Sequence, residues 1–437
     1  MNLSTVLRVG LAGVLTLALA LLLAMPAGAG NDKDPKFTDG QLKKMLKAQL
    51  HERGLEPKGI SSCRPKHAKK VMVCRWRAEG EFPGEIPYEC AGKAKFKVRK
   101  KAWTIDPCNS INEPMMPLNA EPGPHPQFGY NDDWLLQIGR LDLLAGSGAD
   151  IARTGLYWDA VQPTSFNVRL WASFDALYQQ LLSRGIHPLF VIQAAPCWAQ
   201  GGSCHQGAHP APEYFDELAD FAARAAQRYP QAAGLEIWNE PNYEIYWGGP
   251  PDPQAYGQML GQVATAVDAV APNMPVVSAG LSPHIHDESD AMAYESFLRQ
   301  AYQTGGPQLA DAIGTHPYPN RRYTEDYLGN IRVNLFRYFR VMSEFGDGDK
   351  PMWVTETGVS NEGDDEQFDL DQQADALAKI YTMLRRVAHP IPVVVFHRFI
   401  DQPGSPRVKE QGYGVVNGAG QPKPAYCAVA AAREHPC

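Results

Sequence analysis

The sequence predicts an α/β protein in which a small basic α+β domain with disulfide bonds precedes a (β/α)8 barrel. Three observations lead to this fold class. From residue 127 onward, short apolar runs alternate with longer amphipathic stretches, which is typical of parallel strands joined by helices. The chain has 437 residues, more than a single core usually serves. Its charge is also divided unevenly, because residues 31–108 carry 19 lysines and arginines against 10 aspartates and glutamates.

That division separates two parts of opposite charge. The whole chain has a net charge of −7, so the excess of +9 in residues 31–108, with Arg8, leaves −17 for residues 109–437. We therefore place the small basic domain at 30–108 and the barrel at 127–437, with a linker at 109–126 that is rich in Pro and Asn and has no apolar period.

Residues 1–29 are predicted to be a signal peptide. Arg8 gives a positive start, residues 9–25 are almost wholly apolar, and Ala27-Gly28-Ala29 has the small residues that signal peptidase accepts. An uncleaved membrane anchor is the alternative, because the apolar run is close to the shortest length that spans a bilayer. Cleavage predicts a secreted or extracytoplasmic protein without a membrane span. The mature chain has no N-x-[ST] sequon, which suits a bacterial source.

In the basic domain, residues 38–54 predict an amphipathic helix that Thr38 or Asp39 caps. Strands are expected at Val71–Ala78 and Ala94–Ile105, the second with alternating apolar and cationic residues. The cationic face predicts either binding to an anionic surface polymer or a solvated surface without a partner. The eight cysteines of the exported chain predict disulfides between near neighbours in sequence. The expected pairs are Cys63/Cys74, Cys90/Cys108, Cys197/Cys204 and Cys427/Cys437.

In the barrel, eight strands are expected. They are Phe128–Asn131, Ile151–Tyr157, His187–Gln193, Gly234–Trp238, Pro275–Ala279, Ala312–His316, Met352–Thr355 and Val393–His397. Helical patterns separate them at Tyr214–Arg228, Gln254–Val270, Glu295–Gln303, Leu335–Phe345 and Gln367–Val387. Eight such units over some 300 residues favour a TIM barrel over an open sheet. Neither G-x-G-x-x-G after the first strand nor G-x-x-x-x-G-K-[ST] occurs, so nucleotide binding lacks motif support.

Two of these strands end in glutamate. Glu240 follows strand four in Trp238-Asn239-Glu240-Pro241, and Glu356 ends strand seven in Trp353-Val354-Thr355-Glu356-Thr357-Gly358. Because strand ends meet at one mouth of a closed barrel, the two carboxyl groups are expected to face each other. Retaining cleavage of a glycoside needs such a pair about 5–5.5 Å apart, one as acid and base and one as nucleophile. A single glutamate after a strand is more often a cap or a surface charge.

The N-E-P segment after strand four and the W-x-T-E-T-G segment at strand seven resemble the motifs of clan A glycoside hydrolases, most like family 39 and related bacterial enzymes that trim polysaccharides. The resemblance covers most of residues 125–430. It implies a retaining glycosidase of polysaccharides or oligosaccharides, with Glu240 as acid/base and Glu356 as nucleophile. It also implies that Asn239 binds the sugar 2-OH, that Tyr318 of the His316-Pro317-Tyr318 segment orients the nucleophile, and that His316 lines the sugar site.

Further residues carry over from the same resemblance. Arg153 on strand two matches the arginine that keeps the nucleophile ionised, although a structural ion pair is also compatible. Trp158 and Trp198 follow strands two and three, where indoles can stack on sugars or simply pack. His397 is placed among the sugar-binding residues at the end of strand eight. Many clan members have a tryptophan there as the floor of the site. Here either Phe396 or Phe399 is expected to replace it, or another segment is expected to supply the floor residue.

Other functions have weaker support. His284, His286 and Asp287 include metal-binding residue types, but no third ligand strand accompanies them, so no metal or other cofactor is expected. A serine hydrolase lacks its G-x-S-x-G elbow. A carbohydrate- or wall-binding protein without activity needs no paired acid and nucleophile, whereas a transglycosylase needs the same residues as a hydrolase. No nucleic-acid partner is expected.

Overall fold

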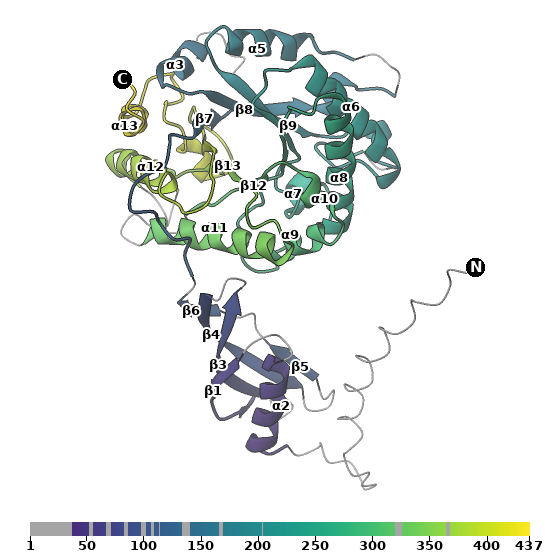
Figure 1. Cartoon of the computed structure of the whole chain (residues 1–437), viewed down its shortest axis with the longest axis vertical. Helices are drawn as coiled ribbons and strands as arrows, with labels where there is room; N and C mark the ends of the chain where they lie inside the picture. The colour runs from purple at the N-terminus through teal and green to yellow at the C-terminus, as the bar shows by residue number, and fades with distance from the viewer. Residues whose placement is uncertain are drawn as a thin grey trace, which may run out of the picture. The chain divides into compact units, whose positions relative to one another are not determined.

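The structure, a computed structural model, describes most of the chain from residue 37 to residue 437. The gaps within that range are 52–55, 67–70, 83–85, 98–101, 106–108, 113, 133–139, 166–168, 203, 320–325 and 364–367. The predicted signal peptide lies outside the described residues. Among the residues described, no helix has the length and hydrophobicity needed to span a membrane. The chain divides into two compact units, one within residues 37–112 and one from residue 114 onward (Figure 1).

The smaller unit packs one helix against an antiparallel sheet, as the α+β prediction requires. The helix is α2 (Asp39–His51), and the main path of the sheet runs β1-β3-β4-β5, with β2 paired to β3 and β6 to β4. The strands are β1 (Glu56–Ile60), β2 (Arg64–Lys66), β3 (Val71–Phe82), β4 (Ile86–Lys97), β5 (Ala102–Ile105) and β6 (Asn109–Asn112).

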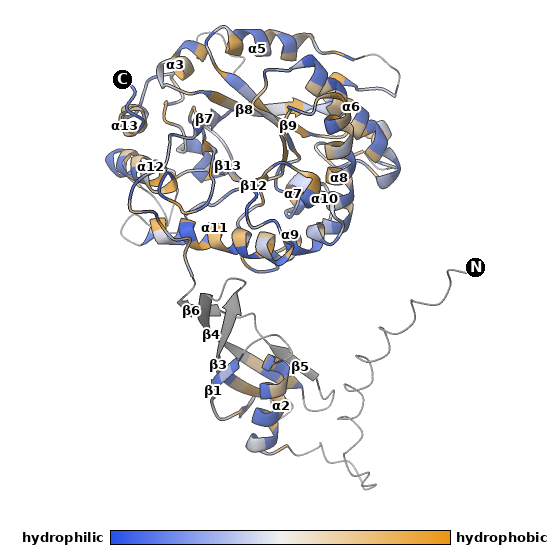
Figure 2. Cartoon of the chain, viewed as in Figure 1, coloured by the Kyte–Doolittle hydropathy of each residue, from blue (hydrophilic) through white to orange (hydrophobic). Residues whose placement is uncertain are grey.

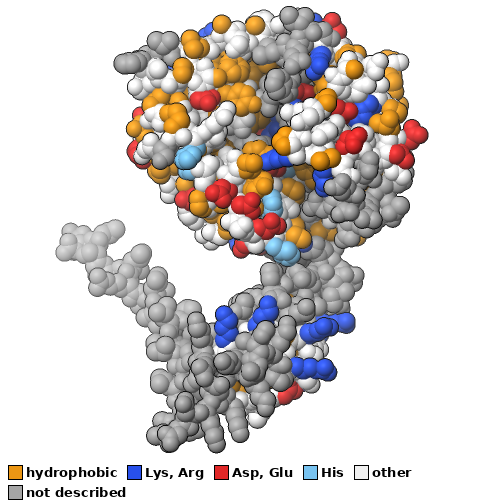
Figure 3. All heavy atoms as spheres, turned by 180° about the vertical axis from the view of Figure 1, so that it is seen from behind, with side chains coloured by type: hydrophobic (Ala, Val, Ile, Leu, Met, Phe, Trp, Pro, Cys, Tyr) orange, Lys and Arg blue, Asp and Glu red, His pale blue; other side chains and the backbone are white. Residues whose placement is uncertain are grey.

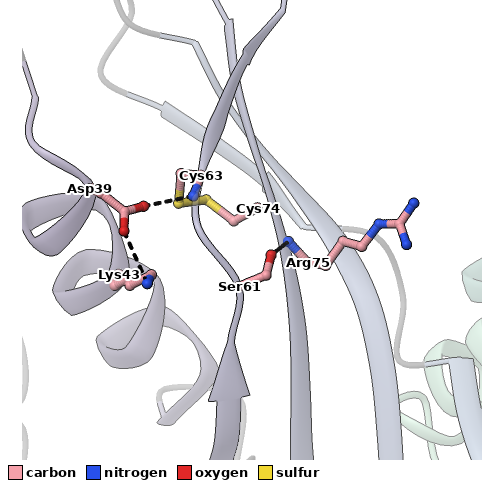
Figure 4. The surroundings of a disulfide bond; sticks show 6 residues. All are labelled: Asp39, Lys43, Ser61, Cys63, Cys74 and Arg75. Carbon is pink, nitrogen blue, oxygen red and sulfur yellow. Dashed lines mark hydrogen bonds and ion pairs between the residues drawn. A yellow bond between two sulfur atoms is a disulfide. The ribbon is translucent and has the colours of Figure 1, made fainter.

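The core of this unit lies between the helix and the sheet. Its buried residues are Leu42, Leu46, Leu50, Cys63, Cys74, Trp76, Ala94 and Phe96. On β4, Ala94 and Phe96 are buried while Lys95 and Lys97 are exposed, so the predicted alternation is confirmed over those four residues. Thr38 caps α2 through a hydrogen bond from the Gln41 amide to its Oγ1. Asp39 instead accepts a hydrogen bond from the Cys63 amide, beside the disulfide (Figure 4).

Two sequence predictions were wrong in this unit. The single strand expected at Ala94–Ile105 is two strands, β4 and β5, which pair antiparallel with Ala94 opposite Ile105. Alternation alone does not reveal a reversal when both arms present the same pattern. The linker expected at 109–126 begins inside the sheet, because Asn109–Asn112 pair with β4. From Leu118 to Gly123 the chain bonds to residues 385–387, at the end of a barrel helix.

The Cys63–Cys74 disulfide closes a short loop and joins β3 to the residues before β2. We expect the double variant Cys63→Ala/Cys74→Ala to lose about 3 kcal/mol of stability in this unit, since the crosslink restricts the unfolded chain. Hydrogen exchange of the β3 amides in the full chain measures the loss, and the barrel amides serve as the internal control. Unchanged protection of β3 would contradict the stabilising role.

The larger unit is a barrel of eight parallel strands (Figure 1). They are β7 (Gln127–Asn131), β8 (Ile151–Tyr157), β9 (His187–Gln193), β10 (Gly234–Ile237), β11 (Val276–Ser278), β12 (Ile313–Thr315), β13 (Met352–Thr357) and β14 (Val393–His397). The order is β11-β10-β9-β8-β7-β14-β13-β12, and a parallel bridge between Val277 and Ala312 joins the two end strands. The predicted (β/α)8 barrel is confirmed, with each strand within two residues of its predicted bounds.

Helices form a ring around these strands (Figure 1). The longer ones are α5 (Ala172–Leu182), α6 (Phe215–Arg228), α8 (Pro253–Val270), α9 (Tyr294–Tyr302), α11 (Tyr327–Glu344), α12 (Leu370–Leu384) and α13 (Pro424–Ala432). Shorter ones are α3 (Leu141–Gly146), α4 (Trp158–Val161), α7 (Glu244–Trp247), α10 (Gly306–Leu309), η1 (Cys197–Ala199), η2 (Pro212–Tyr214) and η3 (Val408–Gln411). Apolar and polar residues alternate along the ring helices (Figure 2), as expected of helices that bury one face.

Two more predicted disulfides are present in the barrel unit. Cys197 pairs with Cys204 after β9, and Cys427 pairs with Cys437 at the end of the chain. The expected pairing of Cys90 with Cys108 lies outside the described residues. Among the described cysteines none is free.

Candidate active site

A polar cavity of about 640 Å³ lies at the mouth of the barrel, where the strands end. Of the residues predicted for the site, it is lined by Arg153, Asn239, Glu240, Tyr318, Glu356 and His397. Arg153 lies within β8, and the others lie at or beyond strand ends: Asn239 and Glu240 after β10, Tyr318 after β12, Glu356 near the end of β13 and His397 at the end of β14. The strands of a closed barrel bring these distant segments together, as the sequence predicted.

Glu240 and Glu356 face each other across a histidine. The His316 Nδ1 lies 2.9 Å from Glu240 Oε1 and 3.3 Å from Glu356 Oε2. One oxygen of each carboxylate and a ring nitrogen of His316 all lie within 4.8 Å of one another. Such a spacing agrees with the short carboxyl separation of retaining glycosidases.

His316 occupies its place because residue 280 is glycine. A Cβ at Gly280 would lie 2.0 Å from Cδ2 and 2.2 Å from Nε2 of the imidazole, closer than any real contact. The ring is almost completely buried, and its Nε2 has no hydrogen-bond partner among the described residues. Its Nδ1 is therefore the nitrogen through which the ring contacts both carboxylates.

Arg153 is held by a buried carboxylate that sequence reasoning missed. Its Nε donates to Glu236 Oε2 at 2.7 Å and its Nη2 to Glu236 Oε1 at 3.2 Å, a bidentate pair. Nη2 also donates to Asn239 Oδ1 at 2.8 Å, and Nη1 lies 3.7 Å from Glu356 Oε2. Arg153 therefore forms both a structural ion pair and a contact with the predicted nucleophile, so the two interpretations of this residue are compatible.

The other oxygen of Glu356 is bound from β7 and β14. Oε1 accepts a hydrogen bond from Asn131 Nδ2 at 3.3 Å and lies 2.6 Å from His397 Nδ1. Burial alone would raise the pKa of Glu356, but the charges of His397, His316 and Arg153 outweigh it and hold the pKa well below its ordinary value. This carboxylate is consequently ionised at neutral pH.

The backbone around Asn239 is strained. Trp238 has φ 75° and Glu240 has φ 44°, which side chains other than glycine rarely adopt. Trp238 is fixed by a hydrogen bond from its Nε1 to the Tyr246 carbonyl, and the Glu240 amide donates to the Gly280 carbonyl. These contacts turn both Asn239 and Glu240 toward the cavity.

Four sequence predictions about the walls of the site need correction. Trp158 is fully buried and packs edge-on against Trp198, and neither indole lines the cavity. The Trp158 Nε1 bonds to Gln162, so this ring fills the layer behind β8. His316 lies behind the carboxylates and does not line the cavity wall.

The expected floor residues are also elsewhere. Phe396 packs edge-on against Phe128, and Phe399 packs against Tyr130, both inside the protein. At the end of β14 the side chain that reaches the cavity is His397. Side chains alternate across a strand, so Phe396 and His397 necessarily point to opposite sides.

Tyr318 lies in the cavity wall, with its ring 6.3 Å from the imidazole of His397 and 5.9 Å from the Tyr413 ring. Burial, and then the negative charge of Glu356, raise its pKa well above the ordinary value, so the phenol stays protonated. The polar contacts described for Glu356 come from Asn131, His316, His397 and Arg153, and not from the Tyr318 hydroxyl. The orienting role expected of Tyr318 thus remains a prediction.

One group of the described residues has the spacing to hold a metal ion, and it is Glu240, His316 and Glu356. The His284, His286 and Asp287 side chains do not come together as such a group. Asp287 instead accepts a hydrogen bond from the Ala293 amide. Since His316 Nδ1 already bonds both carboxylates, the trio is equally suited to proton transfer and charge stabilisation without a metal.

Comparisons with known proteins agree with this architecture. No protein-family model and no curated protein sequence matches the chain. Among solved structures, a family 39 glycoside hydrolase from Bacteroides cellulosilyticus WH2 has a TM-score of 0.57 and 20% identity, over 86% of this chain and 79% of that one. A monomeric β-xylosidase from Caulobacter crescentus CB15 has a TM-score of 0.53 and 20% identity, over 71% and 69%.

A glycoside hydrolase of family GH5_18 from Bifidobacterium longum subsp. longum, solved in complex with Manβ1-4GlcNAc, has a TM-score of 0.53 and 15% identity, over 71% of this chain and 78% of that one. The fold is therefore that of clan A glycoside hydrolases of families 39 and 5, and the predicted resemblance is confirmed for the fold.

Proposed function

We propose that this protein is a secreted retaining glycoside hydrolase that cleaves O-glycosidic bonds of a polysaccharide or oligosaccharide. The observation that carries the proposal is the pair Glu240 and Glu356, whose carboxylate oxygens approach within 4.8 Å at the mouth of the barrel. Glu356 is ionised and Glu240 lies beside it in a polar cavity. A binding protein has no need of this arrangement.

In the proposed reaction, an oxygen of Glu356 attacks the anomeric carbon while the bond to the leaving oxygen breaks. Glu240 gives its proton to that oxygen. Glu240 then takes a proton from water, the hydroxide attacks the same carbon, and the bond to Glu356 breaks with its electron pair returning to the carboxylate. Asn239, fixed by Arg153, is placed to bind the sugar 2-OH, a contact that strengthens as positive charge develops on the ring.

The test is a panel of neutral and acidic polysaccharides and oligosaccharides, with product release measured for the wild type, Glu240→Gln and Glu356→Gln. The first product is followed by ¹H NMR before mutarotation, because retention of anomeric configuration is specific to double displacement. Cleavage that both variants preserve, or an inverted product, contradicts the assignment. Binding of a glycan without cleavage would indicate a carbohydrate-binding protein.

The activity should persist in acid. The pKa of Glu356 lies well below its ordinary value of 4.5, because neighbouring cations favour the carboxylate over the neutral acid. The nucleophile therefore stays ionised as pH falls to 4.5, and we expect the acid limb of kcat/KM to lie below that pH. The measurement is a pH–rate profile from 3 to 7, with circular dichroism to confirm that the protein is folded. A limb centred at or above pH 5 contradicts the charge arrangement.

Secretion rests on the predicted signal peptide at 1–29 and on the disulfides, which form in oxidising compartments.

The smaller unit is proposed to bind an anionic surface polymer. Arg75 and Arg77 on β3 and Lys95 and Lys97 on β4 are exposed beside buried neighbours, so each pair faces outward from the sheet. Figure 3 shows Lys and Arg side chains on the surface of this unit.

We expect the full chain to be retained on an anionic polymer such as polygalacturonate and to elute with salt, since such attraction is screened. Lys95→Glu/Lys97→Glu should elute at distinctly lower salt concentration. Lys44→Glu/Lys47→Glu is the matched control, because these lysines are exposed on α2 rather than on the sheet. Equal effects of the two double variants would show that net charge alone, and not the sheet face, sets retention.

A further inference from the structure

His397 lies between two carboxylates. Its Nδ1 is 2.6 Å from Glu356 Oε1, and its Nε2 is 2.8 Å from Glu410 Oε2. Glu410 belongs to η3, thirteen residues after the end of β14, so the loop that follows the last strand folds back to supply it. Both side chains are largely shielded from solvent, with 13% of His397 and 23% of Glu410 exposed.

We propose that Glu410 is a positioning residue that acts through His397 on the nucleophile Glu356. Both nitrogens of the imidazole carry hydrogens, one donated to each carboxylate. This inference rests on the proposed function, in which Glu356 attacks the sugar. The sequence motifs assign no role to Glu410.

The contacts of Glu356 divide its two oxygens between different tasks. Oε1 is held by His397 Nδ1 and Asn131 Nδ2, at 2.6 and 3.3 Å. Oε2 faces His316 Nδ1 at 3.3 Å and the guanidinium of Arg153 at 3.7 Å, on the side of Glu240. Oε1 is therefore the anchored oxygen, and Oε2 is the oxygen presented for attack. A free imidazole could rotate about its side-chain bonds, whereas one bonded at both nitrogens cannot.

Charge supports the same arrangement. Burial would lower the pKa of His397, but the adjacent Glu356 and Glu410 raise it to about 10. Burial would raise the pKa of Glu410, and the charge of His397 brings it below its ordinary value. The other described ionisable groups close to this cluster include Asp132, Arg153, Glu240, Tyr246, His316, Tyr318, Arg398, Arg407 and Tyr413.

Arg398 also contacts Glu410. It lies 3.8 Å from Glu410 and 3.6 Å from Asp132, while its Nη1 donates to Gln402. Glu410 is thus held from two sides, by His397 and by Arg398. The Glu410 carboxylate, unlike an exposed one, therefore has little freedom to turn away from the imidazole of His397.

The first experiment is a double-mutant cycle on kcat/KM and kcat with a glycan that the wild type cleaves. Glu410→Gln should lower kcat about 10- to 100-fold, as loss of an outer partner does, with little change in KM. His397→Asn keeps a donor near Glu356 but cannot reach Glu410. In the His397→Asn background, Glu410→Gln should change kcat less than about 2-fold, because the imidazole that connects Glu410 to Glu356 is already absent. Multiplicative effects overturn the proposal.

Glu410→Asp restores the charge and should recover part of the loss. Asp349→Asn is the matched control for removing one carboxylate, since Asp349 is exposed in the turn before β13, at the opposite end of the barrel. Its kcat should equal that of the wild type. Thermal melting of each variant separates misfolding from loss of the contact.

A second measurement needs neither substrate nor a Glu410 variant. Histidine side chains of the wild type are labelled with ¹⁵N, and His397 is assigned as the resonance absent from His397→Asn. We expect imidazolium shifts for His397 from pH 6 to pH 9. An imidazole that loses its proton near neutral pH overturns the proposal. Because this titration is independent of turnover, it separates failure of the positioning pair from failure of the proposed glycosidase function.

Discussion

Glu356→Gln should reduce turnover of any glycoside that the wild type cleaves by about five orders of magnitude, because an amide cannot form the glycosyl intermediate and residues of one catalytic unit act together. Single-turnover kinetics on the panel substrate measure the loss. The variant should still bind the glycan, since the amide keeps the shape of the cavity. Residual activity above about 1% of the wild type would contradict the nucleophile assignment.

Glu240→Gln should behave differently. Turnover of a natural linkage should fall about 10²- to 10⁴-fold, the usual contribution of a general acid. Formation of the intermediate from an aryl glycoside with a good leaving group should change little, because that oxygen needs no proton. Glu244→Gln is the matched control, since Glu244 is exposed at the start of α7, four residues further along the chain. Equal losses on both substrate types would contradict the acid role.

Arg153→Met should destabilise the barrel by about 3–5 kcal/mol, because it leaves Glu236 buried without its cation. Glu236 is completely buried and, apart from Arg153, accepts a hydrogen bond from the Gly280 amide. Urea unfolding measures the change. Arg224→Met is the control, since its pair with Asp220 is exposed and such pairs contribute about 0.5 kcal/mol.

The double variant Arg153→Met/Glu236→Gln separates stability from activity. Removing the orphaned charge should recover much of the lost stability, because a neutral amide is far less costly to bury than a carboxylate. Activity should not return, since Asn239 and Glu356 have both lost their contact with the guanidinium. A double variant with restored activity would show that Arg153 has only a structural role.

Much of the barrel could be predicted because the spacing of apolar residues, and the order of strands and helices, can be read directly along the sequence. Eight apolar runs between amphipathic segments define the strands, and the rule that strand ends carry the chemistry places Glu240 and Glu356 together. His397 at the end of β14 was predicted for the site, and the same rule could have found Asn131 at the end of β7. Glu236 also left a signal, because a carboxylate inside a buried strand requires a partner.

Other parts depend on how the chain returns on itself, which the sequence does not display. Glu410 lies in the short helix η3 after β14, and nothing in its sequence neighbourhood distinguishes it from a surface charge. Trp158 was assigned to sugar binding from its residue type, yet indoles fill interiors as readily as they cover sugars. In the smaller unit, one alternating pattern covers two antiparallel strands, β4 and β5, and does not reveal that they are separate.

The left-handed backbone at Glu240 has a consequence for the evolution of this protein. Glutamate is strained at φ 44°, whereas glycine adopts that conformation without steric conflict. Substitution of Glu240 by glycine would therefore relieve the backbone even as it removes the acid. Selection for folding stability favours glycine at position 240, whereas selection for activity favours glutamate. Loss of this side chain is therefore one route by which a related barrel could become inactive and still keep the cavity for binding.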